Sequence, residues 1–155
     1  MQINSIVYDK IFQFDLASQI SFGTLSEEEL YILFKDGRVA SHFLQVLITK
    51  WFPELKFVDG KGFDHLDNSE IKYEMKGFTK RGCKLLPSNQ IGQGRTMNPA
   101  LWHDHVEKNN LSYIITDIVE FPKIRIIFRK GTDLTAAYPN GIVNSSFRSR
   151  FYESK

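Results

Sequence analysis

The sequence has a single cysteine and no long run of apolar residues. With Cys83 alone, an internal disulfide is excluded, which agrees with a reducing compartment. Zinc fingers and ribbons are excluded too, because they need several thiolates or a Cys/His spacing that is absent. No apolar stretch is long enough to cross a bilayer, and residues 1–10 lack the basic-then-apolar layout of a secretory signal. We therefore expect a cytoplasmic protein without membrane contact.

The residues that are present have the composition of a folded domain. Hydrophobic residues make up 42% of the chain, aromatic residues 14% and charged residues 25%, a mixture that argues against a disordered tail. A chain of 155 residues can bury one core but is short for two domains of ordinary size. We expect a single domain over residues 1–155, with its core at about residues 26–130.

Charge is unevenly distributed, although the net charge is only +2. Residues 1–36 hold two basic side chains against six acidic ones. Residues 72–95 hold six basic side chains against one acidic, and residues 121–155 hold seven against two. The two basic segments suit a polyanionic partner, but on charge alone a solvated surface explains them equally well.

Capping residues and apolar spacing predict three helices. Ser26-Glu27-Glu28-Glu29 has the pattern of a capping box, so a helix should begin there. A second helix is predicted from beyond Gly37 to Pro53, because apolar residues recur at spacings of three and four, namely at Val39, Phe43, Val46, Leu47 and Trp51. Asn98-Pro99 supplies a cap and a first-turn proline for a third helix, which should end near Asn109.

The segments between the second and third helices predict short strands, two turns and a loop. Residues 55–66 indicate short strands around a turn at Asp59-Gly60, and Asp67-Asn68-Ser69 indicates a second turn. Residues 71–76 alternate apolar and charged side chains, which is typical of a strand with one buried face. Residues 79–98 hold Gly and Pro among polar side chains, so we expect a long loop.

Two further strands and a tail complete the predicted order. Residues 111–119 and 123–129 are rich in Ile, Tyr and Phe and are separated by a turn near Phe121-Pro122. The tail has turn residues at Pro139-Asn140-Gly141, and its end at residues 147–155 is either a short helix or a loose basic segment. The whole order predicts an α/β fold with a central mixed sheet flanked by helices.

Three residues near the middle of the chain have the types needed to hold divalent cations beside a phosphodiester. Glu74 and Lys76 are two positions apart on a predicted strand and so share a face. Asp64 lies on the other side of the turn at Asp67-Asn68, which would fold it beside Glu74. Carboxylates are the ligands that Mg²⁺ prefers, and the ammonium of Lys76 would orient water and stabilise an anionic transition state. The pattern predicts metal-dependent phosphodiester hydrolysis.

These residues also resemble a known family. Gly62-Phe63-Asp64-His65 followed by Tyr73-Glu74-Met75-Lys76 is similar to the motif of the PD-(D/E)XK nuclease superfamily, which includes most type II restriction endonucleases. The resemblance covers roughly residues 40–130, including the order of helix, three strands, helix and strands. It implies a restriction-endonuclease-like fold, Mg²⁺ held by Asp64, Glu74 and the Met75 carbonyl, and a catalytic role for Asp64, Glu74 and Lys76.

The chain departs from the family pattern at two places. Phe63 stands where the motif has proline. Some members carry a further acidic ligand on the preceding helix, but residues 38–51 contain no acid. The remaining candidates for a third carboxylate are Glu27, Glu28, Glu29, Asp36 and Glu54.

The predicted loop after the strand of Glu74 and Lys76 carries side chains that suit DNA. Asn and Gln read adenine, Arg reads guanine, and lysines and backbone amides bind phosphates. We expect DNA contacts from Lys80, Arg81, Lys84, Ser88, Asn89, Gln90, Gln93 and Arg95.

Functional roles for several other residues are supported more weakly by the sequence. His65 beside Asp64 suggests a ββα-metal nuclease motif, but His103 and His105 would face apart on a helix, so we interpret these histidines as surface or DNA-facing residues. No ordered partner supports Cys83 as a nucleophile. Phe147, Phe151 and Tyr152 suit base stacking or a dimer contact, although packing is their commoner role.

The sequence therefore favours an Mg²⁺-dependent endonuclease that cuts double-stranded DNA as a sequence-specific type II restriction enzyme. Such an enzyme is expected to be a homodimer, because a palindromic target matches a two-fold axis. The alternatives are a structure-specific, repair or phage nicking nuclease or junction resolvase, and a non-catalytic DNA-binding domain.

Overall fold

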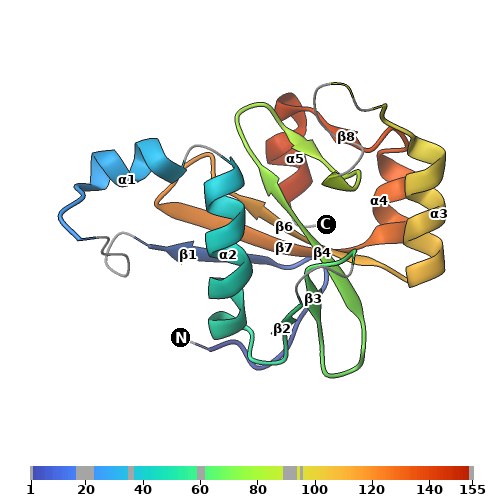
Figure 1. Ribbon diagram of the computed structural model, residues 1–155, viewed down its shortest axis with the longest axis horizontal. Coiled ribbons are helices and arrows are strands. Elements are labelled where there is room, and N and C mark those ends of the chain that lie inside the picture. Colours follow the sequence, from blue (N-terminus) through green and yellow to red (C-terminus); the bar gives the residue numbers. More distant parts are fainter. Residues whose placement is uncertain are drawn as a thin grey trace.

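A six-stranded mixed sheet forms the centre of the computed structural model, which describes residues 2–16, 23–34, 37–58, 62–88, 94 and 96–153 (Figure 1). The strand order is β1-β7-β6-β4-β3-β2. The bounds of these strands are β1 (Ile11–Asp15), β2 (Lys56–Phe57), β3 (His65–Leu66), β4 (Lys72–Phe78), β6 (Ser112–Asp117) and β7 (Lys123–Lys130). A second sheet pairs β5 (Cys83–Lys84) with β8 (Ile142–Val143).

The described part of the chain also forms five α-helices and a short 3₁₀ turn. Their bounds are α1 (Glu27–Phe34), α2 (Gly37–Trp51), α3 (Pro99–Asn109), α4 (Gly131–Ala137), η2 (Ser145–Phe147) and α5 (Arg148–Tyr152). The predicted α/β fold with a mixed, helix-flanked sheet is confirmed. None of the described helices is both long and apolar enough to span a membrane.

The pairing directions explain why α3 is needed. β4 and β6 run parallel, from Tyr73 beside Ser112 to Phe78 beside Asp117, whereas the other neighbours in the six-stranded sheet are antiparallel. Parallel neighbours require a crossover that returns the chain to the same end of the sheet, and the segment containing α3 supplies it. β4 therefore sits between a hairpin partner, β3, and a parallel strand, β6.

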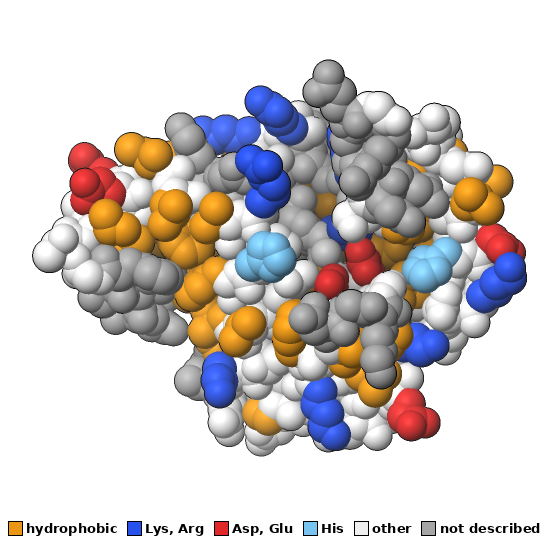
Figure 2. Space-filling view, viewed as in Figure 1, with side chains coloured by type: hydrophobic (Ala, Val, Ile, Leu, Met, Phe, Trp, Pro, Cys, Tyr) orange, Lys and Arg blue, Asp and Glu red, His pale blue; other side chains and the backbone are white. Residues whose placement is uncertain are grey.

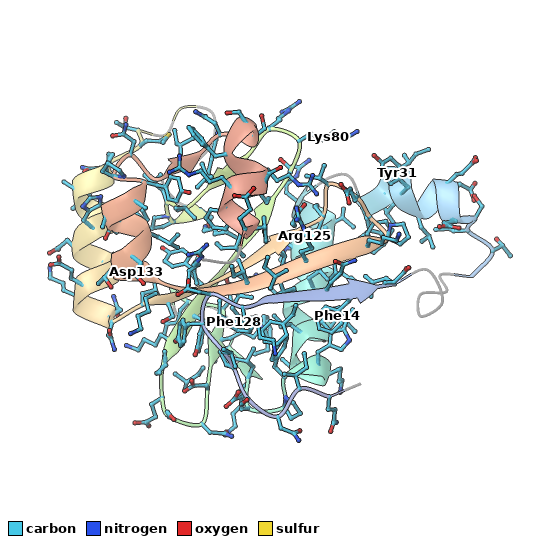
Figure 3. All side chains as sticks on the ribbon, turned by 180° about the vertical axis from the view of Figure 1, so that it is seen from behind. Phe14, Tyr31, Lys80, Arg125, Phe128 and Asp133 are labelled. Carbon is cyan, nitrogen blue, oxygen red and sulfur yellow. The ribbon has the colours of Figure 1, made fainter. Side chains whose placement is uncertain are left out.

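Helices cover both faces of the sheet. On one face the helices α1 and α2 pack on a core that includes Phe12, Phe14 and Phe128 (the last two labelled in Figure 3). On the other face α3, α4 and α5 enclose a second core around Trp102 and Tyr113. All six residues of β6 are buried, as expected for a central strand covered on both sides.

Local helix signals are confirmed by side-chain hydrogen bonds. The Glu29 amide donates to the Ser26 hydroxyl at 3.2 Å, and the Ser26 amide donates to the Glu29 carboxylate at 2.7 Å, which completes the capping box. The Asn98 side chain accepts the Leu101 amide at 3.1 Å at the start of α3. These residues satisfy amides that a helix leaves unpaired.

The predicted apolar face of α2 is partly wrong. Its fully packed residues are Ala40, Leu44, Ile48 and Trp51, whereas Val39 and Val46 are exposed. The buried and the exposed apolar residues both recur at helical spacing. Which of them become buried depends on the side of α2 that packs on the sheet. The neighbouring polar face is thereby turned toward the edge of the sheet that β2 and β3 form.

The prediction of a long loop over residues 79–98 is wrong in its first half. β5 lies within it, and Leu85 and Leu86 have no exposed surface. β5 pairs with β8, a segment that lies far along the chain, so no local pattern indicates it.

The sequence also did not predict β1 and α4. β1 depends on pairing with β7, and α4 is a short helix that begins at glycine, a poor helix former. The turn before Gly141 is confirmed by a Gly141 amide bond to Tyr138.

Candidate active site

A tight turn brings Asp64 beside β4. The Asp67 carboxylate accepts the amides of Ser69 and Ile71 at 2.8 and 2.9 Å and the Tyr73 hydroxyl at 3.0 Å. These bonds hold the turn, and β3 returns as β4 in antiparallel pairing. The predicted turn at Asp67-Asn68 is therefore confirmed, although the turn predicted at Asp59-Gly60 lies outside the described residues.

Asp64 is bonded to the backbone of β4 on both sides of Glu74. Its amide donates to the Tyr73 carbonyl at 2.8 Å, and its carboxylate Oδ2 accepts the Met75 amide at 2.8 Å. The Asp64 carboxylate accepts the Met75 amide in place of the carbonyl of a neighbouring strand. The hydrogen bonds of the sheet therefore fix its position. Asp64 and Glu74, which are ten residues apart in the sequence, are thus held next to each other.

Glu74 and Lys76 share a face of β4, as their alternation predicts. Lys76 Nζ lies 3.0 Å from Glu74 Oε1, and the two side chains are only 11% and 15% exposed. Burial raises the pKa of Glu74, the Lys76 ammonium opposes that rise, and the Asp64 charge adds to it. Two carboxylates and one ammonium are therefore close together in a partly desolvated position, where charges interact more strongly than in water.

The Met75 carbonyl points toward the Asp64 side of β4. The Met75 amide donates to Asp64, and the N–H and C=O of one strand residue point to the same side. The next carbonyl, that of Lys76, accepts the Thr116 hydroxyl of β6 at 3.3 Å and so points the opposite way. The Met75 carbonyl and the two carboxylates make a set of hard oxygen donors that fits Mg²⁺.

Within the described ranges, no third carboxylate joins Asp64 and Glu74 in a metal-binding group. The part of the chain that the structure describes holds no group of three or more His, Cys, Asp or Glu side chains that suits a metal ion. Glu29 serves the cap of α1, and Glu54 accepts the Ile6 amide. Asp36 lies outside the described residues. The donor set of the described site is therefore two carboxylates and one carbonyl.

The site opens into a cleft of about 700 Å³ whose other wall is α2. Figure 2 shows acidic side chains in a hollow near the middle of this face, with a histidine toward α2. Four polar residues of α2 line the cleft together with Asp64, Glu74 and Lys76: Arg38, Ser41, His42 and Gln45. We call these four the α2 polar stripe. Sequence reasoning missed it, although its spacing of three, one and three residues is that of a single helix face.

The predicted DNA-binding residues fall into two groups. Lys80, Arg81 and Lys84 are exposed, and Ser88 is exposed and lines the cleft. Figure 3 shows Lys80 near Tyr31, and its Nζ lies 6.0 Å from the centre of that ring. The other predicted contacts, Asn89, Gln90, Gln93 and Arg95, lie outside the described residues. DNA contact by this segment stays a prediction.

His65 is a structural residue, contrary to its interpretation as a surface or DNA-facing side chain. It has no exposed surface, and its Nε2 lies 2.7 Å from the Gln45 carbonyl. Burial lowers the pKa of His65, so the neutral ring donates to that carbonyl. This bond ties α2 to β3, directly beside Asp64. His103 and His105 lie on α3 and contact Pro139 and Asn109 instead.

Three of the seven basic side chains in residues 121–155 are paired internally. Arg125 and Arg148 both bind the buried Asp117, and Arg129 binds Asp9. Phe151 and Tyr152 are buried, so their role is packing rather than base stacking. Lys123, Lys130 and Arg150 of this segment are exposed, as are the cations of the β4–β5 connection, but only the β4–β5 connection directly follows the strand of Glu74 and Lys76.

Cys83 is expected to be unreactive in the folded protein. It is buried, and burial raises the pKa of its thiol to about 12. At pH 8 the thiol stays protonated, and only the thiolate attacks reagents. A disulfide reagent should therefore label the native protein very slowly and the urea-unfolded protein rapidly and in full. Equal labelling rates in both states would contradict the buried position.

Comparison with known proteins adds no relative: no family model matches this chain, and no curated protein matches it. The candidate site is therefore supported by its own geometry.

Proposed function

We propose that the protein is a Mg²⁺-dependent endonuclease that hydrolyses phosphodiester bonds in double-stranded DNA. The observation that carries the proposal is the bond between the Asp64 carboxylate and the Met75 amide. It sets a carboxylate beside the Glu74–Lys76 pair at the edge of a cleft. This convergence is what the resemblance to the PD-(D/E)XK nucleases implies for these residues.

The residues of the site divide the chemistry between them. Asp64, Glu74 and the Met75 carbonyl would hold Mg²⁺, which when bound neutralises charge on phosphate oxygens and makes water more acidic. Lys76 orients the attacking water and stabilises the negative charge that builds up on the phosphoryl group. The raised pKa of Glu74 supports this assignment, because a cation beside two partly buried carboxylates relieves their repulsion.

The order of elements supports the restriction-endonuclease-like form of the fold. α2 is followed by β2, β3 and β4, and then, after the short β5 of the second sheet, by α3 and β6. Apart from β5, this is the helix, three strands, helix and strand order that the resemblance implies. Within this class we propose a sequence-specific type II restriction enzyme that acts as a homodimer. Exposed Lys80, Arg81, Lys84 and Ser88 would contact DNA on the side where β4 ends.

Incubation with plasmid DNA tests the proposal. The purified protein should cut plasmid in Mg²⁺ and leave it intact in EDTA. Discrete, sequence-dependent fragments are expected of a restriction enzyme. Cleavage of only branched or damaged DNA would replace that assignment by a structure-specific nuclease. DNA binding without cleavage of any of these substrates would instead favour a non-catalytic domain.

A further inference from the structure

The α2 polar stripe lies across the cleft from the proposed metal-binding residues and consists of basic and neutral polar side chains. Arg38, Ser41, His42 and Gln45 line the cleft, while the adjacent stripe of α2 is packed in the core. The helix is held in register with the site by the 2.7 Å bond between His65 and the Gln45 carbonyl. The stripe is therefore a fixed wall of the cleft, from which Arg38 and His42 remain open to solvent.

Phosphodiester hydrolysis needs a group that neutralises the leaving oxygen, and the wall of the cleft that holds Asp64, Glu74 and Lys76 does not supply one. When water attacks phosphorus, one bridging P–O bond breaks and its electron pair stays on the departing oxygen. That oxygen needs a proton or a second cation. The described donor set suits one cation, and the α2 polar stripe adds no carboxylate that would bind another.

One cleft residue has the right chemistry for this proton. Among the described residues that line the cleft, Asp64 and Glu74 are assigned to the cation and Lys76 to the water. Arg38 keeps its proton throughout the accessible pH range, and the hydroxyls of Ser41, Thr79 and Ser88 are far weaker acids than an imidazolium. Imidazole is the side chain that exchanges protons near neutral pH.

We propose, on the basis of the proposed function, that His42 is the general acid that protonates the leaving oxygen. The attacking water forms the new P–O bond and loses one proton to solvent. The bridging P–O bond breaks, and its oxygen takes the proton of the His42 imidazolium. The neutral imidazole then regains a proton from solvent before the next turnover.

A sulfur substitution tests this role directly. The end groups left by the wild type first identify which bridging oxygen departs, and a substrate is made with sulfur at that position. Thiolate is a good leaving group without protonation, because thiols are much stronger acids than alcohols. His42→Ala and His42→Asn should slow cleavage of the oxygen substrate by about 100-fold or more. Both variants should cut the sulfur substrate at nearly the wild-type rate.

Two controls separate proton transfer from binding and folding. His42 is exposed on α2, so both variants should fold and bind DNA in Ca²⁺ with wild-type affinity. Lys50→Ala, an exposed change on the same helix outside the cleft, should leave both cleavage rates unchanged. Equal slowing of both substrates by the His42 variants, or no slowing of either, would overturn the proposal. A wild type that cuts no DNA in Mg²⁺ would instead overturn the proposed function.

Discussion

Replacing Lys76 by methionine or Asp64 by asparagine is expected to slow DNA cleavage by about 100-fold or more, while specific binding in Ca²⁺ stays largely intact. Lys76→Met keeps the buried stem and removes the ammonium that lies 3.0 Å from Glu74. Asp64→Asn keeps a side-chain oxygen for the Met75 amide and removes the charge that a divalent cation requires. Loss of one electrostatic group of this kind slows turnover by about 100- to 1,000-fold.

The measurement is the rate of plasmid cleavage in Mg²⁺ beside DNA binding in Ca²⁺. Lys72→Ala is the matched control, because Lys72 lies on the same strand and the same face but contacts Asn109 and Phe63. It should keep near-wild-type activity. Circular dichroism of each variant verifies that the sheet has formed. Full activity of both Lys76→Met and Asp64→Asn would refute the assigned site.

Replacing Asp117 by asparagine should cause a large loss of stability. The carboxylate is 1% exposed and accepts from Arg125, from Arg148 at 2.8 Å and from the Val119 amide at 3.0 Å. It joins the end of β6 to β7 and to α5, and Arg125 also lies 4.5 Å from the Tyr152 ring. Removing its charge leaves Arg125 without its carboxylate partner and leaves Arg148 with only the exposed Glu120, 3.4 Å away. The free energy of unfolding should fall by about 3 kcal/mol.

Urea denaturation followed by circular dichroism measures this loss as a lower midpoint at an unchanged slope. Asp104→Asn is the matched control: its partner Lys108 is one helical turn away, and both side chains are largely exposed. Exposed pairs of this kind contribute little to stability, so its midpoint should stay at the wild-type value. An Asp117→Asn variant as stable as the wild type would show that the network does not hold α5 on the sheet.

Local patterns in the sequence predicted those features whose causes lie within a few residues. The capping box of Ser26 and Glu29, the Asn98 cap and the shared face of Glu74 and Lys76 all formed as expected. Each depends on the period of a helix or strand, or on one side chain that reaches a nearby amide. The α/β class followed from the order of such segments.

Features that depend on distant partners were not predictable in this way. β1 is a strand because β7 lies beside it, with Ile11 opposite Ile127. β5 forms because β8 returns to it, with Cys83 opposite Val143. Among the apolar residues of α2, the core fully buries Leu44 and Ile48 and partly buries Phe43 and Leu47, whereas Val39 and Val46 stay exposed. Such choices are made by packing between segments, about which a short stretch of sequence holds no information.

The candidate site also combines features set by local sequence with features set by tertiary packing. The sequence by itself determined the residue types of Asp64, Glu74 and Lys76 and the common face of the last two, because strand alternation is a local property. Only the tertiary structure decided that Asp64 replaces a strand partner at the Met75 amide and that His42 faces the same cleft from α2. The reason is physical: a turn held by Asp67 and a helix tied by His65 bring together groups that no sequence period relates.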